Sequence, residues 1–150
     1  MSTFRVDLVA HLSTAVNAYI TANPTIVKRY WRRRPGTFGG EVPLAYMDSI
    51  QEEIQVLDNG TYQRRLETAI VVVDTFADNE QTGARFDTAV DGLVSHLVRN
   101  TYASVSGGLL TLTGVEDTEI EQVSSIERPP VLYRAARLVI VGQIQEGRPS

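Results

Sequence analysis

An uninterrupted apolar run in the middle of the chain constrains the fold more than any other feature. The run Ala69-Ile-Val-Val-Val73 lacks the polar alternation of a half-exposed strand, so both faces of this strand are expected to be covered. It follows the turn signal Asp58-Asn59-Gly60, and Asn-Gly between strand-like segments indicates a β-hairpin. The sequence therefore predicts a hairpin whose return strand, residues 63–76, is buried on both sides.

Two amphipathic helices flank this hairpin. Apolar residues at three- and four-residue spacing predict helices over residues 3–22 and about 80–99. The other strands are expected at residues 25–31, 46–57, 109–113 and 131–145. The segment 46–57 also fits helical spacing through Ile50 and Ile54, and a strand is preferred. The order α-β-β-β-α-β-β, with connections short enough for hairpins, predicts an α+β fold in which two α-helices pack on an antiparallel β-sheet.

The length of 150 residues fits a single domain, residues 1–150, with a long flexible loop at about residues 32–43 that Pro-Gly and Gly-Gly pairs mark. The chain has no cysteine, which excludes disulfides and thiolate metal sites. Its longest apolar runs are far shorter than the ~20 residues that span a bilayer, so no membrane partner is expected. The start shows no signal-peptide pattern, and we expect a protein that acts or is assembled inside a cell.

Two segments of opposite charge are the candidate binding sites. Residues 28–34 read Lys-Arg-Tyr-Trp-Arg-Arg-Arg and hold five of the 14 basic residues and none of the 18 acidic ones. Residues 116–121 hold four carboxylates and are expected in a loop. The candidate contact residues of the basic segment are Arg29, Trp31, Arg32, Arg33 and Arg34. Those of the acidic segment are Glu116, Asp117, Glu119 and Glu121.

Three interpretations fit these segments. Both could be solvated loops without a partner. The basic segment could bind nucleic acid, because arginines pair with phosphates and Tyr30 or Trp31 can stack on bases. A net charge of −4 argues against this, because nucleic-acid modules are typically basic. In a homo-oligomer, the basic loop of one subunit could instead meet the acidic loop of the next.

No catalytic, cofactor or metal site is expected. Asp7 and His11 are four residues apart on a helix, but two side chains do not make a metal site, and a solvated contact explains them. The glycines of residues 36–40 lack the Lys-Ser/Thr of a phosphate-binding loop. No serine lies in the Gly-x-Ser-x-Gly pattern of a hydrolase nucleophile. We therefore expect a protein that is not an enzyme.

Several segments in a fixed order give the chain a family likeness. They are an amphipathic N-terminal helix, Pro-Leu-Ala-Tyr-Met-Asp-Ser-Ile at 43–50, a strand from Arg64-Arg65 to Val73, Asp78-Asn79 before a helix with Phe86, Val90, Leu93 and Val94, and a long C-terminal strand. In this order, over nearly its whole length, the chain resembles the tail terminator proteins of long-tailed bacteriophages.

The resemblance implies a virion structural protein at the junction of tail and neck, assembled in the host cytoplasm. Such proteins form a ring, usually a hexamer, that caps the tail tube, stops its polymerisation and docks to the head–neck connector. The implied partners are further copies of the chain, the major tail tube protein and a connector or neck protein. DNA passes through the lumen without specific binding, which suits an acidic chain because like charges repel.

Within this interpretation, the basic segment lies at a subunit boundary or on the rim of the ring that faces the tube or the neck, and not in the channel. Arg32 to Arg34 are expected to reach outward, while residues 28–31 are anchored in the sheet. Another neck or tail-completion protein is the alternative function. A nucleic-acid-binding module that uses residues 28–34 is a further alternative, from a different class.

Overall fold

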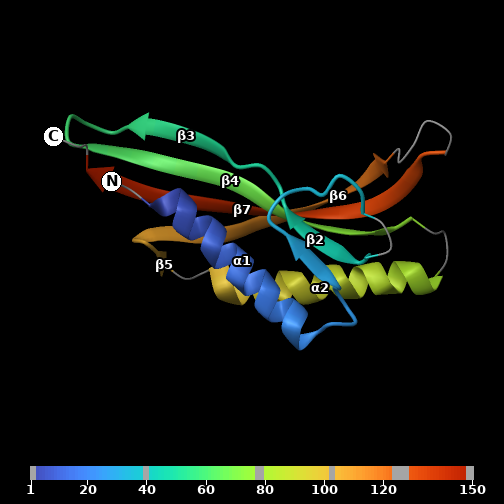
Figure 1. The fold of residues 1–150 in the computed structure, drawn as a ribbon. Helices are drawn as coiled ribbons and strands as arrows, with labels where there is room; N and C mark the ends of the chain where they lie inside the picture. Colours follow the sequence, from blue (N-terminus) through green and yellow to red (C-terminus); the bar gives the residue numbers. More distant parts are fainter. Residues whose placement is uncertain (1–2, 39–40, 77–79, 102–103, 123–128, 148–150) are drawn as a thin grey trace.

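A computed structural model describes residues 3–38, 41–76, 80–101, 104–122 and 129–147. These residues form, in chain order, α1 (Phe4–Ala22), β1 (Arg29–Trp31), β2 (Leu44–Met47), β3 (Gln51–Val56), β4 (Thr61–Thr75), α2 (Glu80–Thr101), β5 (Ser104–Val105), β6 (Gly108–Gln122) and β7 (Val131–Gly147). The strands make one mostly antiparallel sheet, and both helices lie on the same face of it (Figure 1). The predicted α+β class is confirmed.

Three long antiparallel strands, β4, β7 and β6, form most of the sheet. The strand order is β1-β2-β4-β7-β6-β5, with β1 parallel to β2. β3 lies off this path and pairs with residues 62–67 of β4, next to β2, which pairs with residues 70–73. One edge of the sheet therefore consists of β1 and β3, and the opposite edge consists of β6 and the short β5.

The two strands predicted before the Asp58-Asn59-Gly60 turn differ from the observed ones. Residues 24–26 form a turn after α1, in which the Ile26 amide donates to the Asn23 carbonyl at 3.1 Å, so the strand predicted at 25–31 is limited to 29–31. The strand predicted at 46–57 is interrupted between β2 and β3. There the Thr68 hydroxyl donates to the Asp48 carbonyl at 2.9 Å and holds the bend to β4. The helical alternative for this segment is wrong.

The acidic segment lies in a strand, which corrects the expectation of a loop. The strand predicted at 109–113 continues to Gln122 and pairs with β7 over nearly its whole length. In this register Glu116 lies opposite Arg137 and Glu119 opposite Arg134. Glu116 and Arg137 form an ion pair at 2.8 Å, and such a cross-strand pair offsets part of the poor strand propensity of an acidic stretch.

The apolar run of β4 is covered on both faces, as predicted. On one face Ile70 and Val72 pack in a core with the apolar stripes of both helices. On the other face Val71 packs in a second core with Phe38, which belongs to the predicted 32–43 loop. Phe38 is only 2% exposed, and its amide donates to the side chain of Gln122 at 2.9 Å. The described part of this loop is thus anchored on the sheet.

The two histidines join the helices. Nε2 of His11 lies 2.7 Å from the Asn100 carbonyl oxygen, and Nε2 of His96 lies 2.7 Å from the Ala15 carbonyl oxygen. Because a carbonyl only accepts hydrogen bonds, Nε2 donates in both pairs. Both side chains therefore serve helix packing. Neither described helix is long and apolar enough to span a membrane.

Candidate functional site

The two charged segments occupy opposite edges of the sheet. The basic segment forms β1 and the turn that follows it, at the edge shared with β3. The acidic segment lies in β6, at the other edge. Among the described residues no ion pair joins the two segments. Inside the subunit the two segments meet through apolar side chains, because Trp31 packs against the core that holds Ile120. A salt bridge between their charged side chains would involve two molecules.

Part of the basic segment is held within the subunit. The Arg29 guanidinium pairs with Glu41 at 2.7 Å and lies 3.9 Å from the centre of the Trp31 ring. Tyr30 points toward α1, where its hydroxyl lies 3.0 Å from that of Ser13. Burial raises the pKa of this tyrosine. Arg29 and Trp31 thus anchor β1, which leaves the arginines after β1 as the outward-facing part.

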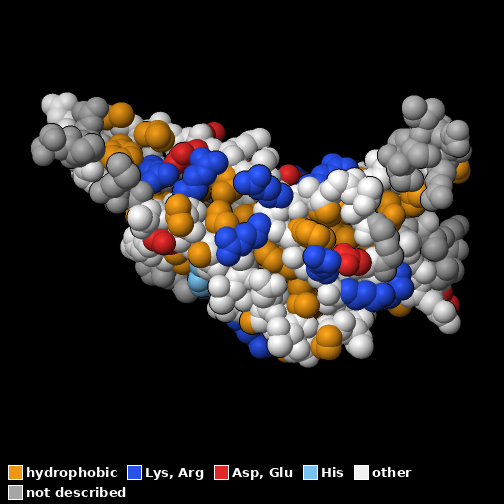
Figure 2. Space-filling model, in the orientation of Figure 1, with side chains coloured by type: hydrophobic (Ala, Val, Ile, Leu, Met, Phe, Trp, Pro, Cys, Tyr) orange, Lys and Arg blue, Asp and Glu red, His pale blue; other side chains and the backbone are white. Residues whose placement is uncertain are grey.

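These arginines line a surface groove, which we name the arginine groove. The groove has a volume of about 650 Å³ and lies between the first half of α1 and the β2–β3 break. Its arginines are Arg5, Arg32, Arg33 and Arg34, and its apolar lining includes Val9, Met47 and Ile50. Figure 2 shows Lys and Arg side chains spread along this face, with hydrophobic side chains between them.

Arg32, Arg33 and Arg34 are exposed and form no ion pair with a described residue. The Arg34 guanidinium carbon lies 5.9 Å from the centre of the Phe38 ring, in a cation–π contact. The expectation that these three side chains reach outward is confirmed. Sequence reasoning missed Arg5, because no pattern links the first turn of a helix to a segment more than twenty residues later.

The acidic segment divides between the two faces of β6. Asp117 lies opposite Ala136, which belongs to the helix-side core, while Ile120 lies opposite Tyr133 in the core of the other face. Because side chains alternate along a strand, three carboxylates share the helix side. We name them the acidic row, and they are Asp117, Glu119 and Glu121.

Among the described residues, only one of the four carboxylates, Glu116, has an ion-pair partner. Glu116 lies on the opposite face from the acidic row and pairs with Arg137 at 2.8 Å. The three residues of the acidic row are exposed and form no ion pair with a described residue. Four carboxylates that looked equivalent in the sequence therefore have two different roles.

Both charged edges leave backbone groups open. β5 pairs with β6 only at Gly108 and Leu109, and no described strand covers the outer side of β6 beyond them. β3 pairs on one side only, and all six of its residues are exposed. Unpaired strand edges are surfaces to which another chain can be added.

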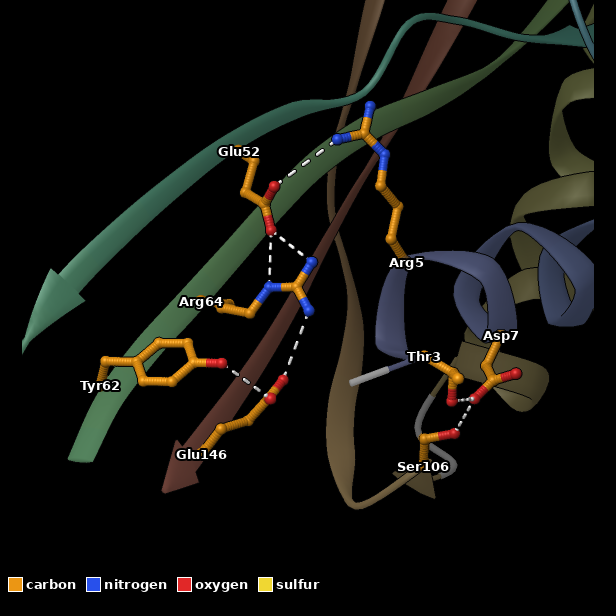
Figure 3. Close-up of polar contacts among 8 residues, drawn as sticks. All are labelled: Thr3, Arg5, Asp7, Glu52, Tyr62, Arg64, Ser106 and Glu146. Atoms are coloured by element: carbon orange, nitrogen blue, oxygen red, sulfur yellow. Dashed lines mark hydrogen bonds and ion pairs between the residues drawn. The ribbon is translucent and has the colours of Figure 1, made fainter. Parts of the chain in front are cut away.

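An arm of the sheet extends past the start of α1 (Figure 1). It consists of β3, the start of β4 and the end of β7, and Arg64 holds these strands together through Glu52 at 2.6 Å and Glu146 at 3.4 Å (Figure 3). The Tyr62 hydroxyl donates to Glu146 at 3.0 Å, and this hydrogen bond raises the pKa of Tyr62. Ile54, on the same face, remains 63% exposed.

The described residues hold no cluster of metal-ligating side chains. No group of three or more His, Cys, Asp or Glu side chains among them could hold a metal ion. Asp7, which the sequence places near His11, contacts Ser106 and Thr3 instead (Figure 3). These hydroxyl hydrogen bonds lower the pKa of Asp7. The contact joins α1 to the turn before β6.

Comparisons with known proteins identify the fold. No family model and no curated protein matches the sequence. Among solved structures, the chain is similar to a chain in the virion of a native gene transfer agent particle. The TM-score is 0.61 at 16% sequence identity, and the match covers 97% of this chain and 100% of that one. A likeness at this identity establishes a shared fold over the whole chain.

Proposed function

We propose that this protein is a virion structural protein, and specifically a tail terminator of a long-tailed phage or phage-like particle. The observation that carries the proposal is the full-length fold similarity to a chain of the gene transfer agent virion. The order of sequence segments that resembles tail terminators supports the finer assignment. The proposed role is not enzymatic, and the protein acts through its surfaces.

The proposed mechanism is self-assembly into a ring. A contact between two different edges of a subunit is heterologous, and it closes into a ring when the rotation between subunits permits. The oppositely charged edges of this sheet are suited to such a contact. A closed ring on the last layer of a tail tube leaves no free site for further tube subunits. Its other face would then receive the connector or neck protein, and DNA would pass through the lumen.

Tube growth in the presence of the purified chain tests this function. The major tube protein of the same particle is allowed to polymerise with and without the chain, and tube lengths are measured by negative-stain electron microscopy. The proposal predicts shorter tubes that carry one extra ring at one end. Tubes of unchanged length without bound chain would contradict it.

The alternative function is that of another neck or tail-completion protein. The fold similarity supports it equally, because the matched structure is described only as a virion. Location discriminates between the two. In a map of the intact particle, a terminator must contact the last tube ring directly. A position between other neck proteins, with no tube contact, would assign the chain to the neck instead.

A further inference from the structure

We propose that the arginine groove of one subunit binds the acidic row of a second copy of this chain. The inference rests on the proposed ring and deepens it, because it names the two surfaces that meet at each subunit boundary. The groove contributes Arg32, Arg33 and Arg34, and the row contributes Asp117, Glu119 and Glu121.

Charge complementarity selects the occupant of the groove. The three arginines and the three carboxylates are exposed, and none of them forms an ion pair with a described residue of its own subunit. Two neighbouring charges have partners inside the subunit, since Arg29 pairs with Glu41 and Glu116 pairs with Arg137. Complementary charged surfaces guide association and fix which surfaces meet.

The placement of the two surfaces fits a head-to-tail contact. They lie at opposite edges of the sheet, and the groove opens on the side of the acidic row, because Met47 and the Ala136 neighbour of Asp117 belong to the helix-side core and Val9 packs against it. Arg34 lies at the border of the groove, near the Phe38 ring of the other core. In a ring, every subunit presents the same face outward. An adjacent copy can therefore bring its acidic row to the groove without turning its sheet over.

The shape of β6 also suits the groove. Residues 113–119 are exposed and their outer backbone edge has no described strand partner, so this part of β6 can approach another surface. Alternate side chains on a strand lie about 7 Å apart, so the acidic row spans roughly 13 Å. Val115 precedes the row on the same face, opposite Leu138, and is 43% exposed. It can meet the apolar lining of the groove while the carboxylates meet the arginines.

A charge exchange between two variants of the full chain tests this contact. The first variant replaces Arg32, Arg33 and Arg34 by Glu, and the second replaces Asp117, Glu119 and Glu121 by Lys. We expect each variant alone to assemble about 100-fold more weakly than wild type, because like charges then face each other across the boundary. Mixed in equal amounts, the two variants should assemble again, because every boundary in an alternating ring regains opposite charges.

Controls separate the contact from general charge effects and from misfolding. Arg99→Glu and Asp87→Lys change exposed helix residues away from both surfaces and should assemble as wild type does. Circular dichroism and thermal unfolding should show that each triple variant is folded. Assembly itself is measured by light scattering over a range of protein concentrations.

Each outcome has one interpretation. Recovery of assembly on mixing supports the contact. Normal assembly of either triple variant alone, or failure of two folded variants to assemble on mixing, overturns it while the ring function stands. Wild type that stays monomeric contradicts the proposed function itself. Normal assembly of the arginine variant with loss of salt-sensitive duplex DNA binding would make the groove a nucleic-acid site and would also overturn the contact.

Discussion

At the scale of single residues, intramolecular partners decide which charged side chains remain for another molecule. Arg29 is occupied by Glu41 and the Trp31 ring, and Glu116 is occupied by Arg137. The sequence groups these residues with their charged neighbours and cannot separate them, because their partners are brought near by the fold. The candidate site therefore narrows from nine residues to the six that have no ion-pair partner among the described residues. Arg5 also lines the arginine groove, but it pairs with Glu52 at 3.5 Å.

The hairpin turn before β4 provides a pH prediction. The amides of Gly60 and Thr61 donate to the Asp58 carboxylate at 2.7 and 2.8 Å, and these bonds lower the pKa of Asp58 below its ordinary value of 3.8. A lowered pKa in the folded state means that this stabilisation is present above the ordinary value and is lost as pH falls through the lowered one. NMR titration of the two amides should show a midpoint below 3.8. A midpoint at or above that value would contradict the geometry.

Asp74 provides a stability prediction. Its side chain is fully buried, and Arg85 donates to both carboxylate oxygens at 2.5 and 2.8 Å, which raises the pKa of Arg85. Asp74→Ala should lower the free energy of unfolding by about 1–3 kcal/mol, since hydrogen bonds to charged groups are lost. The Arg85 side chain is 43% exposed and can hydrogen-bond to water in the variant, which limits the loss of stability. Urea unfolding measures the change, with exposed Asp87→Ala as the control, and equal stabilities of the two variants would refute the prediction.

At the scale of elements, the periodicity of apolar residues predicted the helices and strands whose signals are local in the sequence. Both helices and the central strand follow from apolar spacing, and the structure confirms them. The extension of β6 to Gln122 was missed because its support comes from pairing with another strand, β7, which includes the Glu116–Arg137 ion pair. The β2–β3 break was missed for the same reason, since Thr68 of β4 stabilises it. Long-range pairing overrides local propensity at these points.

Two glycines of β6 form a matched pair for testing the packing of this element. A Cβ at Gly108 would lie 2.9 Å from the Gln143 carbonyl oxygen and would also meet the Phe4 ring, while a Cβ at Gly114 would meet nothing within 4 Å. Gly108→Ala should therefore cost about 1–3 kcal/mol of stability through overpacking. Gly114→Ala should leave stability unchanged or slightly higher, because it restricts the unfolded chain. Similar melting temperatures for both variants would show that α1 is not packed against this end of β6.

At the scale of the whole molecule, the sheet carries basic and acidic surfaces at opposite edges, and the chain has a net charge of −4. This arrangement attracts unlike edges of two copies and disfavours contact between like edges. The sequence contains the two charged segments, but their separation by the width of the sheet emerges only from strand order.

Salt should weaken assembly if charge complementarity drives it. Raising the ionic strength from about 0.05 M to about 0.5 M shortens the screening length several-fold, so exposed charge pairs attract less. We expect a higher protein concentration at half assembly, with little change in the thermal stability of the subunit, whose cores are apolar. Light scattering and calorimetry at matched salt concentrations measure the two quantities. Assembly that strengthens with salt would favour an apolar interface instead.

Electron microscopy of the purified native oligomer tests the central claim most directly. Class averages should show a closed ring with a central opening and one repeated subunit boundary, in which the β1–Arg34 edge of each copy faces the β6 edge of the next. Particles that remain single subunits at all concentrations, or that form two-fold dimers through identical edges, would contradict the account.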